Sequence, residues 1–157
     1  MKKLMILLAA AALLFTGCKE DNWMDWKLQN ELWLQQNIKN DPEVKQTESG
    51  LQYKIVHQGN TTDAKPHEGS TVYVDYTGYL INGYQFDSGT YSALAISSVV
   101  DGFAEGMKKI YPGGDIMLYI PWDLGYDEDG QGTEGNTGFI PPYSTLIFDI
   151  HLCAVSN

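Results

Sequence analysis

A predicted β-hairpin over residues 72–88 constrains the fold of this chain more than any other stretch. It reads VYVDYTGYLINGYQFDS, and its first half alternates apolar and polar side chains, as in a strand with one buried face. Asn82-Gly83 predicts a tight turn, because both residues tolerate a positive φ. The returning strand would bring Phe86 and Asp87 close to Tyr76. The sequence therefore predicts two aromatic side chains and one carboxylate at the mouth of an apolar hollow.

Three further segments predict strands. Apolar and polar residues alternate over 51–56, 116–120 and 145–155, which is the period of a strand. Residues 90–98 break this alternation, so we expect a short irregular segment there. Together with the hairpin, these segments give four or five strands.

One short helix is predicted after residue 100. Asp101 is the expected N-cap, and Phe103, Met107 and Ile110 follow at helical spacing, which favours a helix of about three turns. So few helices cannot cover both faces of a doubly wound sheet. The sequence therefore predicts an α+β fold in which a twisted antiparallel sheet wraps around this helix.

Residues 1–17 predict a targeting signal. Lys2 and Lys3 precede an apolar run over 4–15 that is too short to span a bilayer. The run ends in FTGC, which resembles a bacterial lipoprotein signal, in which the cysteine, here Cys18, is lipidated and becomes the first residue. The alternative is an ordinary secretory signal with an incidental cysteine.

The N-terminal region after Cys18 predicts a helix over 23–38, with Asn22 as its cap and Asn40-Asp41-Pro42 as its stop. Its many apolar side chains do not fall on one helical face. We expect docking on the following domain or self-association. Contact with the membrane surface is disfavoured, because the segment carries several acidic residues.

Composition excludes some classes of site. The net charge is -10 and all 10 basic residues are Lys, so no basic patch for nucleic acid is present. If Cys18 carries lipid, Cys153 has no disulfide partner and is expected to pack in the last strand. The histidines, His57, His67 and His151, fit no metal-ligand spacing. Neither a metal nor a cofactor is predicted.

Five blocks occur in a specific order along the chain: SGLQYKIV, VDYTGYLINGYQFDS, VVDGFAEGM, LYIPWDLGY and IPPYSTLIFDI. This ordered set resembles the FKBP-type peptidyl-prolyl cis-trans isomerases over roughly residues 48–155. The signal and the short helix are similar to those of envelope lipoprotein members from Bacteroides-like bacteria. The resemblance implies a lipid-anchored segment over 18–47 and an isomerase domain over 48–157, with the active hollow between sheet and helix.

The resemblance also implies the site residues. In the family, the backbone N–H at the Val100 position and the hydroxyl at the Tyr126 position hold the substrate carbonyls. The catalytic positions fall on Tyr76, Phe86, Asp87, Tyr126 and Phe148, and the substrate-binding positions on Val99, Val100, Phe103 and Ile140.

This chain departs from the family pattern in three places. Phe103 stands where Trp is common, residues 89–98 lack the basic residue that often pairs with Asp87, and the loop after Tyr126 is longer and more acidic.

The implied function is prolyl isomerisation that assists protein folding in the cell envelope. Rotation about the X–Pro bond makes and breaks no covalent bond, so it requires neither a nucleophile nor a metal. The partners would be proline-containing polypeptides, with the membrane reached through lipid on Cys18. The alternative is a proline-peptide binding module or holdase chaperone with little turnover.

The acidic loop over 127–134 allows a second interpretation. Asp127, Asp129 and Gln131 match positions 1, 3 and 5 of a calcium loop, and Gly132 matches its sharp turn. The twelfth position is Gly138, which has no side-chain ligand. We therefore favour a solvated acidic flap at the mouth of the site over a calcium site.

Overall fold

The computed structural model describes residues 23–157; the predicted signal, Cys18 and the predicted cap Asn22 lie outside this range. Within this range no helix has the length and apolar character needed to cross a membrane. The elements are α1 (Met24–Asn40), β1 (Lys45–Gln46), β2 (Gln52–His57), β3 (Thr71–Tyr79), β4 (Gln85–Ala95), the 3-10 helix η1 (Ile96–Ser98), α2 (Asp101–Met107), β5 (Gly114–Ile120), the 3-10 helix η2 (Trp122–Leu124) and β6 (Leu146–Ser156).

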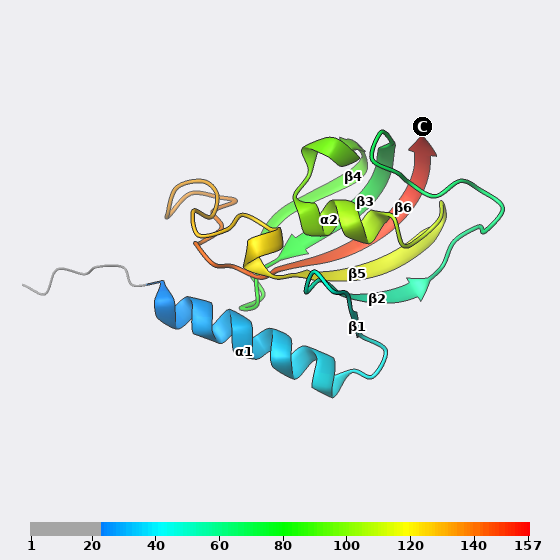
Figure 1. Ribbon diagram of the computed structural model, residues 1–157. Coiled ribbons are helices and arrows are strands. Elements are labelled where there is room, and N and C mark those ends of the chain that lie inside the picture. The colour runs from blue at the N-terminus through cyan, green and yellow to red at the C-terminus, as the bar shows by residue number, and fades with distance from the viewer. Residues whose placement is uncertain (1–22) are drawn as a thin grey trace, which may run out of the picture.

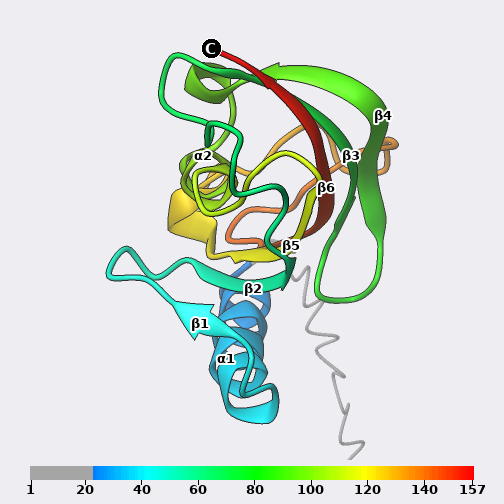
Figure 2. The same ribbon diagram turned by 90° about the vertical axis from the view of Figure 1, so that its right-hand side faces the viewer.

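The strands form one antiparallel sheet in the order β1-β2-β5-β6-β3-β4, which curves around α2 (Figures 1 and 2). This confirms the predicted α+β fold. The core lies between the concave face of the sheet and α2, because alternate residues of each strand point inward. Leu146, Phe148, Ile150 and Leu152 of β6 are all buried, as the alternation predicted.

Two glycines let α2 lie close to β5. A Cβ atom at Gly102 would stand 2.4 Å from Ile120 Cγ2, and one at Gly106 would stand 2.4 Å from Leu118 Cδ2. The absence of both side chains therefore allows the close approach of helix to strand. Phe103 and Met107, on the same helix, are buried in the core as predicted.

The hairpin between β3 and β4 forms, but its turn differs from the prediction. Gly83 has a positive φ of 83°, whereas Asn82 does not have a positive φ. The Leu80 N–H donates to the Tyr84 carbonyl, and the Gly83 N–H donates to the Leu80 carbonyl. The loop therefore has three residues, with one glycine in the left-handed region rather than two residues with positive φ.

The prediction of irregular chain over 90–98 is wrong for residues 90–95, which continue β4. Val74 pairs with Ser92 and Tyr76 pairs with Gly89, so Thr90 and Tyr91 form a bulge opposite β3. The extra residue in this bulge interrupts the alternation of inward and outward side chains. The sequence pattern therefore does not indicate a strand here.

The prediction that Asp101 caps the helix is also wrong. Asp101 is the first helical residue, and Val100 holds the N-cap position without a side-chain cap. The helix begins there because the Val100 carbonyl accepts the N–H groups of Phe103 and Ala104. At seven residues, α2 is also shorter than predicted.

The helix α1 docks on the domain, as one of the predicted alternatives stated (Figure 1). In its C-terminal half, the Trp33 ring lies 5.8 Å from the Tyr119 ring, and Gln52 Nε2 donates to the Leu34 carbonyl. The opposite face leaves Met24, Leu28 and Leu32 exposed. The scattered apolar residues therefore divide between a docked face and an outer face.

Candidate active site

Four aromatic rings meet on the concave face of the sheet. Phe148 on β6 lies at their centre, with its ring centroid 5.4 Å from that of Phe86 and 5.3 Å from that of Phe103, both in edge-to-face geometry. The Tyr76 centroid lies 6.1 Å away. Edge-to-face packing is favourable for aromatic pairs and fixes the orientation of each ring. Tyr76, Phe103 and Phe148 form rigid apolar walls of a small hollow, and Phe86 packs against Phe148.

The hollow is a cleft of about 200 Å³ with seven of the nine predicted site residues in its lining. An adjoining hollow of about 370 Å³ shares Asp87, Tyr126 and Phe148 with it and adds Phe86 and Ile140. The structure therefore brings all nine predicted residues together. The lining of the first cleft is Tyr76, Asp87, Leu94, Ser98, Val99, Val100, Phe103, Tyr126 and Phe148.

Sequence reasoning missed four contributors to the site. Leu94 and Ser98 line the cleft from the segment over 90–98 that was predicted to be irregular: Leu94 lies on β4 and Ser98 in η1. Gly78 and Gly89 make room for the rings: a Cβ atom at Gly78 would stand 2.6 Å from Phe86 Cζ, and one at Gly89 would stand 2.6 Å from Tyr76 Cε1. The sequence does carry a signal for these two glycines. A glycine within a predicted strand indicates that another group, here an aromatic ring, lies close to the backbone.

The carboxylate of Asp87 is held by neutral donors. The Tyr76 hydroxyl donates to Asp87 Oδ2 at 2.8 Å, and the Ser88 N–H donates to Asp87 Oδ1 at 2.8 Å. Burial, with the hydrogen bond to Asp87 as a second cause, raises the pKa of Tyr76 to about 12. Burial and the Asp87 charge also raise the pKa of Tyr126. Both phenols therefore stay protonated near neutral pH and can donate hydrogen bonds.

Two donors at the cleft have no acceptor within the described chain. Neither the Val100 N–H nor the Tyr126 hydroxyl donates a hydrogen bond to another residue of 23–157. Both belong to residues in the lining of the cleft. Such donors can satisfy the carbonyl groups of a bound ligand, because buried polar groups require partners.

The described residues offer no assembled metal site. Within 23–157, no three His, Cys, Asp or Glu side chains gather where they could hold a metal ion. Cys153 is half-buried, and burial raises the pKa of its thiol, which keeps it protonated and unreactive. His151 Nδ1 lies 2.7 Å from Asp115 Oδ1, away from the cleft.

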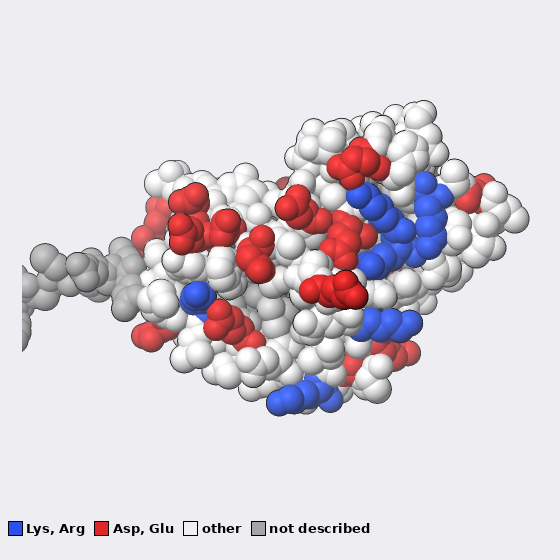
Figure 3. All heavy atoms as spheres, in the orientation of Figure 1, with Lys and Arg blue, Asp and Glu red and all other residues white. Residues whose placement is uncertain are grey.

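The loop after Tyr126 contributes only uncharged residues to the lining of the site. Gln131, Gly132, Thr137 and Gly138 line the adjoining hollow. The acidic side chains lie elsewhere on the loop: Glu128, Asp127 and Asp129 all contribute to raising the pKa of Tyr143, after burial. In Figure 3 the left of the view carries mostly acidic side chains, whereas Lys and acidic side chains lie side by side in the centre and on the right.

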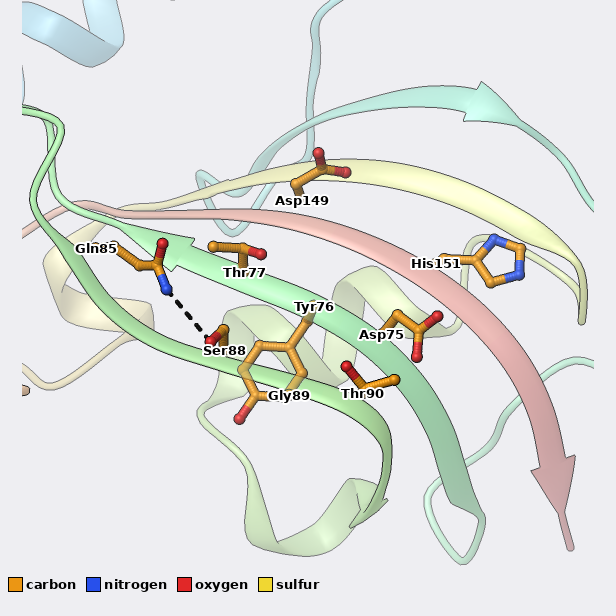
Figure 4. Close-up of a pocket in the computed structure, with 9 residues that line it drawn as sticks. All are labelled: Asp75, Tyr76, Thr77, Gln85, Ser88, Gly89, Thr90, Asp149 and His151. Carbon is orange, nitrogen blue, oxygen red and sulfur yellow. Dashed lines mark hydrogen bonds between the residues drawn. The ribbon is translucent and has the colours of Figure 1, made fainter.

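A larger hollow of about 630 Å³ lies on the outer face of the sheet (Figure 4). Asp75, Thr77, Asp149 and His151 line it, and these side chains alternate along β3 and β6 with the inward-facing residues. It lacks the apolar walls that would exclude water. The aromatic cleft is therefore the better candidate for chemistry that depends on desolvation.

Comparison with known proteins agrees with this geometry. The family model for FKBP-type peptidyl-prolyl cis-trans isomerase matches residues 62–153. A probable FKBP-type peptidyl-prolyl cis-trans isomerase FkpA of Neisseria meningitidis is 38% identical over 133 residues, covering 82% of this chain and 46% of the relative. The outer membrane protein MIP of Legionella longbeachae is 37% identical over 155 residues, covering 96% of this chain and 61% of the relative.

The crystal structure of FkpA from Escherichia coli superimposes with a TM-score of 0.78 at 33% identity, covering 87% of this chain and 62% of that one. The chain thus spans between about half and three-fifths of the length of these relatives.

Proposed function

Because the chain belongs to the FKBP-type peptidyl-prolyl cis-trans isomerase family, we propose that it catalyses cis/trans exchange of X–Pro bonds in polypeptides. The observation that carries the proposal is the aromatic cleft. It is lined by the rings of Tyr76, Phe103, Tyr126 and Phe148, and two of its lining residues, Val100 and Tyr126, carry unpaired donors. A proline ring is compact and apolar, and it matches such walls. The flanking carbonyl groups of the substrate match the donors.

The proposed mechanism is desolvation with orientation. Rotation about the amide bond removes its resonance and faces a barrier of about 18–20 kcal/mol. Water stabilises the polar planar amide more than the twisted one, so an aromatic cleft that excludes water lowers the barrier. An acceleration of about a million-fold requires about 8 kcal/mol. Orientation of the substrate's flanking carbonyl groups also contributes to this reduction of the barrier.

The residues take distinct proposed roles. Phe86, Phe103 and Phe148 hold the proline ring, while the Val100 N–H and the Tyr126 hydroxyl bind carbonyl oxygens. Asp87 holds the Tyr76 hydroxyl and supplies electrostatic support, and it transfers no proton. Val99 and Ile140 complete the apolar walls.

A protease-coupled proline-peptide assay on the full chain tests this proposal. Phe86→Ala should lower kcat/KM by about tenfold or more, because it removes a wall of the adjoining hollow and the ring that packs edge-to-face on Phe148. Tyr91→Asn is a matched control: it removes an exposed ring from the same strand, and Asn tolerates the φ of 48° at this position. No acceleration by the wild-type chain would refute the proposal and favour the alternative, a binding module or holdase without turnover.

The proposed setting is the cell envelope, with the mature chain anchored through lipid on Cys18, as in lipoprotein members from Bacteroides-like bacteria. The signal pattern supports this proposal, and one relative is named an outer membrane protein. Self-association through α1 is supported by the outer face formed by Met24, Leu28 and Leu32, which are spaced one helical turn apart. Sedimentation of a Leu28→Gln, Leu32→Gln variant tests it, and an unchanged oligomeric state would contradict it.

A further inference from the structure

The N-terminal half of α1 lies against residues 139–145, the segment that begins beside Ile140 in the wall of the site (Figure 1). The helix presents one face to this segment, because the residues involved follow at helical spacing. The contacts join Trp23 to Phe139, Trp26 to Ser144, Lys27 to Tyr143 and Asn30 to Thr145.

Asn30 forms the deepest of these contacts. Its side chain is fully buried, and its Oδ1 accepts the Thr145 N–H at 2.7 Å. Its Nδ2 donates to the Trp26 carbonyl at 2.8 Å. Thr145 is also fully buried, so without Asn30 its N–H would lose its partner in a place that water does not reach. The end of the loop is thereby fixed to the helix.

Trp26 reaches further toward the site. Its Nε1–H donates to Ser144 Oγ at 2.9 Å, and the Ser144 hydroxyl donates to the Pro141 carbonyl at 2.7 Å. Pro141 directly follows Ile140. The N–H and the carbonyl of Ile140 both bond to Gln131, each at 2.8 Å, and Gln131 and Ile140 both line the hollow beside the cleft. Two hydrogen bonds and the peptide link between Pro141 and Ile140 therefore connect α1 to the wall of the site.

We propose that Trp26 and Asn30 are positioning residues of the isomerase site, which hold the wall formed by Ile140 and Gln131 through residues 141–145. The inference rests on the proposed isomerase function and extends it to the N-terminal helix. The helix would then be part of the catalytic apparatus rather than a spacer to the membrane.

The helix offers a matched control for this proposal. Asn37 lies two turns beyond Asn30 on the docked face, and its Nδ2 donates to Gln52 Oε1 at 3.0 Å, on β2 and away from the cleft. Loss of either asparagine weakens the docking of α1. Only loss of Asn30 disturbs the segment that leads to Ile140.

The test compares Trp26→Phe, Asn30→Ala and Asn37→Ala in the full chain, assayed well below their melting temperatures. Trp26→Phe keeps an aromatic ring at this position, although a smaller one, and removes the N–H donor to Ser144. We expect it to lower kcat/KM by about 3- to 10-fold, mainly through a higher KM, because one hydrogen bond and a wall that contacts bound substrate are affected. Asn30→Ala should have at least this effect, and Asn37→Ala should keep the wild-type kcat/KM.

A second readout separates positioning from catalysis. The methyl resonances of Ile140 in the NMR spectrum should shift in Trp26→Phe and Asn30→Ala, and stay in place in Asn37→Ala. Wild-type kinetics and unshifted Ile140 methyl groups in Trp26→Phe would overturn the proposal, as would an equal loss of activity in Asn37→Ala. A wild-type chain without isomerase activity would refute the proposed function instead, and the methyl shifts would still test the positioning.

Discussion

Replacing Gly78 by Ala should damage the site without removing any of its functional groups. Gly78 is buried on β3 and has no positive φ, so its backbone accepts alanine. The new Cβ would stand 2.6 Å from Phe86 Cζ and 2.9 Å from Phe148 Cε1. Carbon atoms in contact need about 3.5–4.0 Å, so both rings must retreat by roughly 1 Å.

The expected magnitude follows from this displacement. Overpacking costs about 1–3 kcal/mol, and the smaller entropy of the unfolded alanine chain offsets about 0.4–1 kcal/mol of that. We therefore expect a loss of about 1–2 kcal/mol in the free energy of unfolding. Misplacement of about 1 Å at a site can cost about 100-fold in rate, so kcat/KM should fall by roughly 10- to 100-fold.

Chemical denaturation and the proline-peptide assay measure these two effects. Gly69→Ala is the control, because Gly69 is exposed and its Cβ would meet nothing closer than 3.4 Å. Phe86→Leu placed in the Gly78→Ala background should be less destabilising than in the wild type, since the smaller side chain relieves the clash. A folded Gly78→Ala variant with the wild-type rate would refute the steric argument.

Three further predictions concern pH, charge and anchoring. The pKa of Tyr76 is raised from about 10 to about 12, so the native state keeps this proton up to a higher pH than the unfolded state does. Its contribution to stability should be complete below about pH 10 and lost as the pH rises through about 12, and Tyr76→Phe should remove that part of the alkaline loss in a denaturation series. Peptides with Lys beside the proline should be captured faster than peptides with Glu at low salt, and the difference should fade as the Debye length shrinks from about 10 Å at 0.1 M to about 3 Å at 1 M. Equal rates at low salt would show that the acidic loop does not steer substrates, and the preference should vanish when amides replace the carboxylates of Asp127, Glu128, Asp129 and Glu134. Cys18→Ala should release the protein from the membrane fraction on centrifugation, and unchanged membrane association would contradict lipid anchoring.

Local patterns determined much of the architecture in advance. The alternation along β6 and the first arm of the hairpin predicted which side chains enter the core, because a strand buries every second residue. The helical spacing of Phe103 and Met107 predicted the buried face of α2. The nine site residues came from ordered sequence blocks, and the structure gathers all of them at one cleft and the hollow beside it.

The tertiary structure alone decided the features that depend on distant neighbours. The bulge at Thr90 and Tyr91 places two residues of β4 opposite one residue of β3, and it breaks the alternation by which strands are recognised. The need for glycine at position 78 arises from rings on two other strands. Asn30 bonds to a residue 115 positions away. A local pattern reports only which face of an element is buried; what that face meets is determined by the packing of the whole chain, because the partners are brought together by folding and not by sequence spacing.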